Sequence, residues 1–330
     1  MAAVATIGMA IGLFGLVAHD YLSQSTAPAA PVVRLSAAPV LPPSAAPASP
    51  LLVRVSMFKP ATVNNVAGSS SKLAALFERI GYRMDLVLAR GEVPRLFMSS
   101  LPYDMPAIRP AARRKLIFIK AALPLILHVN ELILLDRARL TVLRDRDRRK
   151  LAMSSVDDAW LLALTKKYRL GKPDFDALLR RVDIIPPSLA LAQSAEESGW
   201  GTSRFAREGN ALFGQRTWNS KSGLVPLERA AGEKHRVRVF GHLIDGVKSY
   251  ANNLNSHAAY DGFRRLRAEF RAAGKTIDGV RLAGMLTRYS ERGADYIQTL
   301  HAIMRVNRLS MLDNVRLGDR IDSSPAGPDA

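Results

Sequence analysis

One segment constrains the fold of this chain more than any other: residues 183–214, with the sequence DIIPPSLALAQSAEESGWGTSRFAREGNALFG. Pro186 and Pro187 hold φ near the helical value, so they favour the first turn of a helix. Residues 188–198 contain no helix breaker, and Gly199 can adopt the left-handed conformation that ends a helix. The segment therefore predicts a buried helix that ends at Ser198 and is followed by a tight Gly-Trp-Gly turn.

Two glutamates lie in the last turn of this predicted helix. The partial negative end of the helix dipole disfavours the ionised forms of Glu196 and Glu197, and partial burial beside Trp200 would add to that effect. Both effects raise the pKa of a carboxyl group, which a general acid working near neutral pH requires. Composition alone does not choose between the two glutamates. The alternative is a pair of solvated carboxylates at an ordinary helix end.

Five motifs narrow these alternatives: QSAEESGWG (193–201), TSRFA (202–206), GNALFG (209–214), RYSERGADY (288–296) and NRL (307–309). Together they closely resemble glycoside hydrolase family 73, the peptidoglycan endo-β-N-acetylglucosaminidases, which include the flagellar-rod type. The similarity is greatest to the Bax-type members and covers roughly residues 86–309. Glu-Ser-Gly-Trp-Gly is specific in this context, whereas lytic transglycosylases share the Glu-Ser pair. The resemblance implies a mainly α (α+β) fold, with a lysozyme-like helical catalytic domain and a small β-hairpin lobe.

The resemblance also implies roles for individual residues. Glu197, directly before Ser-Gly-Trp-Gly, would be the proton donor, and Glu196, about 100° away around the helix, would not be required. A second carboxylate is expected in the β lobe, where Glu228 matches the family pattern better than Glu233. The residues around Glu228 depart from the usual threonine-rich surroundings. Tyr289 matches a tyrosine that lies in the cleft and assists at the acetamido sugar.

Aromatic side chains near the motifs are candidates for substrate binding, because sugar faces stack on aromatic rings. Core packing is the alternative for each of them. The six histidines are scattered without metal-binding spacing, and there is no phosphate-binding or dinucleotide-binding glycine motif. The sequence therefore predicts neither a metal nor a cofactor. The substrate-binding candidates are Trp200, Phe213, Trp218 and Tyr296.

The charge of the chain restricts its partners. Forty-seven basic residues against 29 acidic ones give a formal net charge of +18, and there is no cysteine. This balance favours anionic partners: nucleic acid, a membrane surface or an acidic polymer. The resemblance favours the carboxylates of cell-wall peptides and implies no nucleic acid. A solvated basic surface is the alternative, because the basic residues are scattered and many have Asp or Glu nearby.

The N-terminal 56 residues predict an attachment to the membrane. Residues 1–22 form an anchor or signal segment whose first 17 residues are apolar, with no preceding Lys or Arg and no clear cleavage site. These features favour an uncleaved anchor over a cleaved signal. Residues 23–56 predict an extended linker, because fifteen of the 27 residues from 24 to 50 are Ala or Pro. We therefore expect a periplasmic protein held at the inner membrane. A plain disordered spacer is the alternative for the linker.

The rest of the chain is expected to divide into a helical N-terminal region (57–172), a catalytic domain (173–312) and a disordered tail (313–330). Helical periodicity is strongest over 113–147, where Pro124 marks a kink or break. This helix is expected in the core rather than in a membrane, because its charged and polar residues would be costly in lipid. These residues are Lys120, His128, Asn130 and Glu131.

Shorter elements follow from periodicity and capping signals. A capping box at 155–158 opens a helix that ends near Gly171, and a turn at 219–223 separates two strands. The other predicted helices cover 71–80, 174–182, 247–254, 260–272, 277–286 and 294–307; the strands cover 215–218 and 235–240; and 93–110 is predicted as loop with short turns.

The sequence thus predicts a glycoside hydrolase that cleaves β-1,4 bonds after N-acetylglucosamine in peptidoglycan. The first alternative is a lytic transglycosylase, which would cut after the muramic sugar and leave an anhydro ring. The second is a wall-binding protein with an inactive cleft. The separation of the two carboxyl groups would decide between inversion and retention of configuration.

Overall fold

The computed structural model describes residues 62–63, 68–217, 223–226 and 236–318, all of which belong to one compact unit of the chain. The described part is mainly helical with a small antiparallel strand pair, which confirms the predicted fold class. Several predictions lie outside the described residues: the anchor (1–22), the linker (23–56), Trp218, Glu228 and Glu233.

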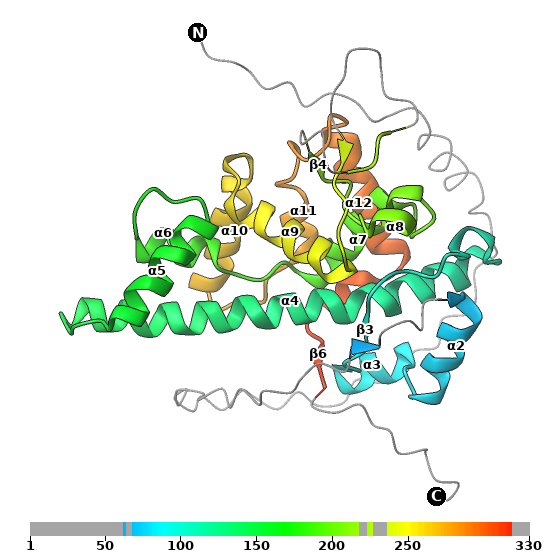
Figure 1. The fold of residues 1–330 in the computed structure, drawn as a ribbon, viewed down its shortest axis with the longest axis horizontal. Helices are drawn as coiled ribbons and strands as arrows, with labels where there is room; N and C mark the ends of the chain where they lie inside the picture. Colours follow the sequence, from blue (N-terminus) through cyan, green and yellow to red (C-terminus); the bar gives the residue numbers. More distant parts are fainter. Residues whose placement is uncertain (1–61, 64–67, 218–222, 227–235, 319–330) are drawn as a thin grey trace, which may run out of the picture. The chain divides into compact units, whose positions relative to one another are not determined.

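The long helix α4 (Ala111–Arg148) is the element around which the other helices are arranged (Figure 1). It lies between the front helices α2 and α3 on one side and the helices that follow it in the sequence on the other. Its contacts include α2 (Ser70–Arg79), β3 (Phe97–Met98), α6 (Phe175–Arg181), α7 (Pro187–Ser198) and α9 (Leu243–Ser256).

Helix α4 belongs to the core, as predicted. Among the described residues it is the one helix long and apolar enough to cross a membrane, and 78% of its most apolar window is buried inside the fold. The helix continues through Pro124, so the predicted break is wrong. Proline removes a helical hydrogen bond. Because Leu123, Pro124 and Leu125 are all buried, the apolar surface removed from water there offsets that loss.

Serine side chains cap two of the helices at their N-termini. Ser69 accepts a hydrogen bond at the N-terminus of α2. Helix α5 (Ser155–Lys167) is capped by Ser154, whose hydroxyl accepts from the Asp157 backbone N–H at 3.2 Å and donates to the Asp157 carboxylate at 2.8 Å. This reciprocal pair satisfies a free N–H of the first turn. The predicted capping box therefore begins at Ser154 rather than at Ser155.

Helix α7 is the predicted buried helix, and it is packed on several sides. Its N-terminus is capped from far along the chain, because the Asp313 carboxylate accepts from the Ser188 backbone N–H at 2.8 Å and from its hydroxyl at 2.7 Å. A Cβ on Gly279 would lie 2.1 Å from the Ser188 hydroxyl, so only glycine allows this close packing. The neighbours of α7 are α4, α11 (Gly279–Ala283), α12 (Ala294–Val306) and the 3-10 turn η4 (Leu309–Leu312).

The tail predicted from residue 313 starts too early. Besides Asp313, which caps α7, residues Arg316–Leu317 form β6 and pair in parallel with β2 (Glu92–Val93). The Arg95 side chain also donates to the carbonyl of Gly318 at 2.8 Å. Pairing with a distant strand orders this segment despite its polar composition. Residues 319–330 lie outside the part of the chain that the structure describes.

The remaining elements are short. Strand β1 (Thr62–Val63) pairs in parallel with β3, and β4 (Arg216–Thr217) pairs with the antiparallel β5 (Arg236–Val237) within the two predicted strands. The 93–110 segment contains β3 and η2 (Met105–Ala107). The other helices are α3 (Met84–Arg90), α8 (Arg204–Gly209), η3 (Ala258–Tyr260) and α10 (Asp261–Ala272).

One continuous hydrophobic core joins the predicted N-terminal region to the predicted catalytic domain. Helix α4 from the first region packs against α7 and α9 from the second. The N-terminal region therefore helps to hold α7, the helix with the two glutamates, in place. The boundary between the N-terminal region and the catalytic domain, between residues 172 and 173, stays a prediction.

Candidate active site

The chain turns sharply where α7 ends. Gly199, Trp200 and Gly201 have φ values of 57°, 58° and 79°, so three consecutive residues adopt the left-handed conformation. The Ser198 hydroxyl stabilises this turn, because it donates to the Ser194 carbonyl at 2.5 Å and accepts from the Gly201 N–H at 2.9 Å. The helix end at Ser198 and the tight Gly-Trp-Gly turn are confirmed.

Glu197 lies in the last turn of α7, with its carboxyl group beside buried groups. The Tyr296 hydroxyl donates to Oε1 at 3.0 Å, and a Cβ on Gly214 would lie 3.0 Å from Oε2. Burial raises the pKa of Glu197 to about 7, although the Tyr296 hydrogen bond acts in the opposite direction. The nearby charge of Glu196 also raises this pKa, and Arg292 and Arg216 lower it. Glu197 can therefore hold a proton near neutral pH, as a general acid must.

Glu196, the neighbouring carboxylate, has a different environment. The Arg292 guanidinium donates to Glu196 Oε1 at 2.7 Å and to the Thr299 hydroxyl at 2.6 Å. Glu196 is therefore an ion-paired carboxylate that connects α7 to α12. The structure thus gives different environments to the two glutamates that composition could not separate.

Tyr289 is close enough to Glu197 for the charge of that carboxyl group to affect its pKa. Its ring stacks on that of Tyr296 with centroids 5.7 Å apart, and its hydroxyl donates to the Phe213 carbonyl at 3.3 Å. Burial raises the pKa of Tyr289 well above its usual value, and the charge of Glu197 raises it further. The hydroxyl therefore stays protonated and can donate a hydrogen bond. Its assistance at a sugar stays a prediction.

Two of the predicted substrate-binding aromatics are packed inside the protein. Phe213 is 3% exposed and stacks on Tyr250 with centroids 3.9 Å apart, so the predicted sugar contact is replaced by core packing. Tyr296 is 1% exposed, and its hydroxyl is used on Glu197 rather than on a ligand. Sugar-stacking residues must present a ring face to solvent, which neither side chain does.

Of the other two substrate-binding candidates, the structure describes Trp200 but not Trp218. Trp200 is partly buried, with its ring edge-to-face against Phe118 at 5.8 Å and Lys115 Nζ 5.1 Å from its centre. Its contact with a sugar stays a prediction, as does that of Trp218, which lies outside the described residues. Arg216 on β4 is close enough to affect the pKa of Glu197, so the β lobe begins beside the acid. Glu228 lies in the part of that lobe that is not described.

Two polar residues beside the site were missed from the sequence. Gln193 on α7 and Tyr250 on α9 are buried and hydrogen-bonded to each other at 2.7 Å, and Gln193 also donates to Tyr296 at 2.9 Å. A glutamine within a helix predicted to be buried was the available signal, since buried polar groups need partners. Its partner, Tyr250, lies in the predicted helix 247–254 and gave no signal.

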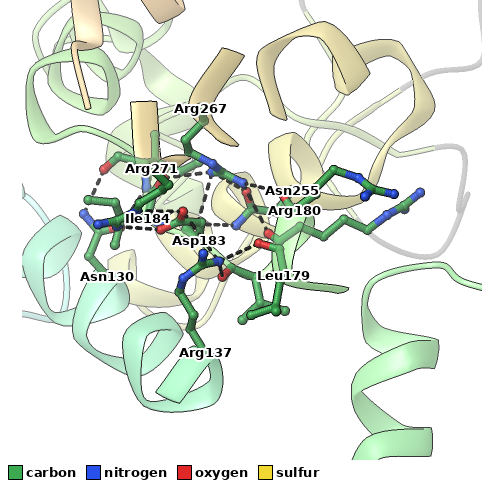
Figure 2. A network of polar contacts seen from close by, with 12 residues as sticks. Asn130, Arg137, Leu179, Arg180, Asp183, Ile184, Asn255, Arg267 and Arg271 are labelled. Atoms are coloured by element: carbon green, nitrogen blue, oxygen red, sulfur yellow. Dashed lines mark hydrogen bonds and ion pairs between the residues drawn. The ribbon is translucent and has the colours of Figure 1, made fainter. Parts of the chain in front are cut away.

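A second buried carboxylate, Asp183, lies in the segment that leads into α7 (Figure 2). Arg271 donates to both of its oxygens, at 3.1 and 2.8 Å, and Arg137 lies 3.6 Å away. Burial alone would raise the pKa of Asp183, but Arg271, Arg267 and Arg137 together hold it below its usual value. Asp183 is therefore ionised at neutral pH and has no proton to donate.

Arg267 completes this network from the core side (Figure 2). It donates to the carbonyls of Asp183 and Ile184 at 3.1 and 2.8 Å and to the Asn255 side chain at 2.7 Å. Burial lowers the pKa of Arg267 to about 10, so it remains charged. These bonds hold the backbone that enters α7, which makes the network structural.

A cavity of about 350 Å³ lies beside this network, lined by Arg137, Arg180, Asp183 and Arg271 among others. It is near the N-terminus of α7, so roughly 15 Å of helix separates it from Glu197. Asp183 there is ionised and paired, whereas Glu197 combines a raised pKa with the predicted motif. Of these two carboxyl groups, Glu197 is therefore the candidate for acid chemistry. Among the described residues no group of three His, Cys, Asp or Glu side chains is placed to hold a metal ion.

Two comparisons with known proteins give the family of the chain. The sequence profile of the family described as mannosyl-glycoprotein endo-β-N-acetylglucosaminidase, the glucosaminidase domain, matches residues 172–309. Protein Bax of Escherichia coli strain K12 is 32% identical over 216 residues, which are 64% of this chain and 75% of Bax. No solved structure matches the chain. The chain therefore belongs to the family of protein Bax and has the glucosaminidase domain of a glycoside hydrolase.

Proposed function

We propose that the protein is a peptidoglycan endo-β-N-acetylglucosaminidase of glycoside hydrolase family 73 that uses Glu197 as its general acid. The observation that supports this most is the carboxyl of Glu197, whose pKa is raised to about 7 by burial at the exit of α7. The neighbouring Glu196 is instead ion-paired with Arg292. The glucosaminidase match over residues 172–309 supports the bond that we propose is cleaved.

In the proposed reaction the proton of Glu197 moves to the oxygen that links two sugars. The bond from that oxygen to the anomeric carbon of N-acetylglucosamine breaks, and its electron pair stays on the oxygen. Positive charge then develops at the anomeric carbon, where a second carboxylate or the 2-acetamido group of the sugar stabilises it. We propose Glu228 for the second carboxylate, which positions or activates the attacking water. Tyr289 assists at the acetamido group.

The chemistry is tested by the sugar ends that the protein releases from purified peptidoglycan. Hydrolysis after N-acetylglucosamine leaves a reducing N-acetylglucosamine end, and mass spectrometry identifies it. A lytic transglycosylase would instead leave an anhydro-muramic end, and that product would overturn the proposal.

The acid is tested by a matched pair of variants. Glu197→Gln keeps the shape of the side chain but removes the transferable proton, so we expect lysis of sacculi to fall by at least about a hundredfold. Glu196→Gln is the control and retains most activity. Undiminished lysis by Glu197→Gln would refute the assignment, and binding without cleavage by the unmodified protein would favour the inactive wall-binding alternative.

We further propose that the protein works in the periplasm, held at the inner membrane by residues 1–22 and extended from it by residues 23–56. The apolar N-terminus and the Ala/Pro-rich linker support this proposal. The net charge of +18 supports attraction to wall-peptide carboxylates, which salt should weaken. Fractionation of cells tests the location: the intact chain is expected with the membrane, and recovery of uncleaved chain in the soluble fraction would contradict the anchor.

A further inference from the structure

A chain of hydrogen bonds lies behind Glu197, and it joins three helices. The Tyr250 hydroxyl on α9 contacts Gln193 Oε1 on α7 at 2.7 Å, and Gln193 Nε2 contacts the Tyr296 hydroxyl on α12 at 2.9 Å. The Tyr296 hydroxyl contacts Glu197 Oε1 at 3.0 Å. Gln193, Tyr250 and Tyr296 are at most 1% exposed, so solvent does not compete for these bonds.

The chemistry of these groups gives the chain one direction. An amide nitrogen only donates, so the Tyr296 oxygen accepts from Gln193 and its single proton points to Glu197. The amide keeps this orientation because the Tyr250 proton occupies Gln193 Oε1. Reversing the amide would turn Tyr250 into an acceptor and would take the Tyr296 proton away from Glu197. Every proton in the chain therefore points toward Glu197 Oε1.

We propose that Gln193 and Tyr250 are positioning residues that act through Tyr296 and hold the transferable proton of Glu197 on Oε2. A proton on Oε1 would face the proton that Tyr296 already directs at that oxygen. The opposite oxygen, Oε2, faces Gly214, where even a Cβ would come within 3.0 Å of it. Because Gly214 has no side chain, no Cβ occupies that position 3.0 Å from the proton-bearing oxygen.

The inference rests on the proposed function for its catalytic meaning. During glycoside cleavage the bond between Oε2 and its proton breaks, and the proton forms a new bond to the leaving sugar oxygen. The glycosidic electron pair goes to that same oxygen. Glu197 is left as a carboxylate whose Oε1 is already stabilised by Tyr296. The chain of hydrogen bonds thus already stabilises the carboxylate that forms when Glu197 loses its proton. It does not have to rearrange in that step.

The direction of the chain has a measurable consequence. Because Tyr296 donates to Oε1, the chain favours the ionised form of Glu197 and opposes a proton on Oε1. Removing the hydrogen bond of Tyr296, Gln193 or Tyr250 weakens this preference for the ionised form and therefore raises the titration midpoint of Glu197. The variants that interrupt these hydrogen bonds retain the other charged or titratable groups that affect Glu197 or are affected by it. These groups are Glu196, Arg292, Arg216, Tyr289 and Tyr260.

The experiment is a carboxyl ¹³C NMR titration of the full chain labelled at glutamate side chains, with the Glu197 signal assigned by its loss in Glu197→Gln. In Tyr296→Phe the midpoint should rise by about one pH unit, because a hydrogen bond to the carboxylate is lost. Tyr250→Phe and Gln193→Met should each raise it on the order of half a pH unit. Tyr250→Phe keeps the ring, so its fold is expected to persist. Gln193→Met is the second, independent variant.

The matched control is Tyr260→Phe, which removes a hydroxyl bonded to Asn253 in the same aromatic cluster but outside the chain. Its midpoint should match that of the unmodified protein. If Tyr250→Phe and Gln193→Met titrate like this control, or shift downward, the proposal is overturned. The titration needs no substrate, so it separates this proposal from the proposed function. Undiminished lysis by Glu197→Gln would refute only the latter.

Discussion

A buried or partly buried carboxyl group lies at each end of α7, and the pKa values of the two groups are shifted in opposite directions. Asp183, before the helix, is held by two hydrogen bonds from Arg271 and by the charges of Arg137 and Arg267, and its pKa is lowered. Glu197, in the last turn, receives a hydrogen bond from the neutral hydroxyl of Tyr296, and its pKa is raised to about 7.

Burial acts in the same direction at both ends, since it raises the pKa of a carboxyl group. The difference lies in the partners. Guanidinium groups reverse the effect of burial on the pKa of Asp183, whereas the Tyr296 phenol, Arg292 and Arg216 only reduce that effect at Glu197. The cations around Asp183 keep it ionised, whereas Glu197 keeps a raised pKa despite the two arginine charges near it. The same helix thus joins a structural end to the proposed chemical end.

The largest effect should come from the structural end. Asp183→Asn removes a charge but leaves Arg267 and Arg271 in place, so we expect a loss of about 3–5 kcal/mol in the free energy of unfolding. Chemical denaturation measures it. Asp176→Asn is the control, because Asp176 is 66% exposed and 3.6 Å from Arg144, and it should cost less than about 1 kcal/mol. Equal losses in both variants would remove the distinction between the two ends.

A change of opposite sign is expected at the chemical end. The pKa of Glu197 is raised from 4.5 to about 7, so the folded state binds this proton more tightly than the unfolded state. The resulting stability is fully present below pH 4.5 and is lost as the pH rises through about 7. Glu197→Gln avoids this loss and should gain about 3 kcal/mol relative to the unmodified protein between pH 4.5 and pH 8.

Denaturation of both proteins at pH 5 and at pH 8 measures this gain. Glu196→Gln, which removes the partner of Arg292, should show no comparable gain at pH 8. A difference between Glu197→Gln and the unmodified protein that is the same at both pH values would show that Glu197 is not protonated more readily in the folded state.

The smallest of these effects concerns the space beside Oε2. Gly214 and Gly81 both have left-handed backbones, with φ of 57° and 63°, so substitution by alanine should cost each about 1 kcal/mol of stability. Only Gly214→Ala places a Cβ 3.0 Å from Glu197 Oε2, whereas nothing lies within 4 Å at Gly81. Lysis should therefore fall on the order of tenfold in Gly214→Ala and stay unchanged in Gly81→Ala. Equal activity of the two variants would mean that Oε2 needs no free space.

The sequence predicted α7 and the turn after it well, because both depend on local backbone chemistry. Pro187 begins the helix, and Gly199 ends it in the left-handed conformation. The mainly helical class and the core position of α4 likewise followed from periodicity. Local rules worked where a residue's neighbours in sequence determine its conformation.

Contacts between residues far apart in the sequence determine the features that could not be predicted from it. The choice between Glu196 and Glu197 depends on Arg292 and Tyr296, which lie 96 and 99 residues further along the chain. The family resemblance pointed to Glu197 before these contacts were known. The disordered tail was placed too early because β6 pairs with β2, more than 220 residues away. Gln193 showed only as a polar residue in a helix predicted to be buried, without a sign of its two tyrosine partners.

The most direct test of the central claim is the rate of glycan cleavage by the unmodified protein as a function of pH, measured as sugar ends released from purified peptidoglycan. The account predicts that the rate falls as the pH rises, with a midpoint near the pKa of Glu197 at about 7, because an ionised carboxylate has no proton to donate. A rate that stays constant up to pH 9, or that is already lost at pH 5, would contradict it.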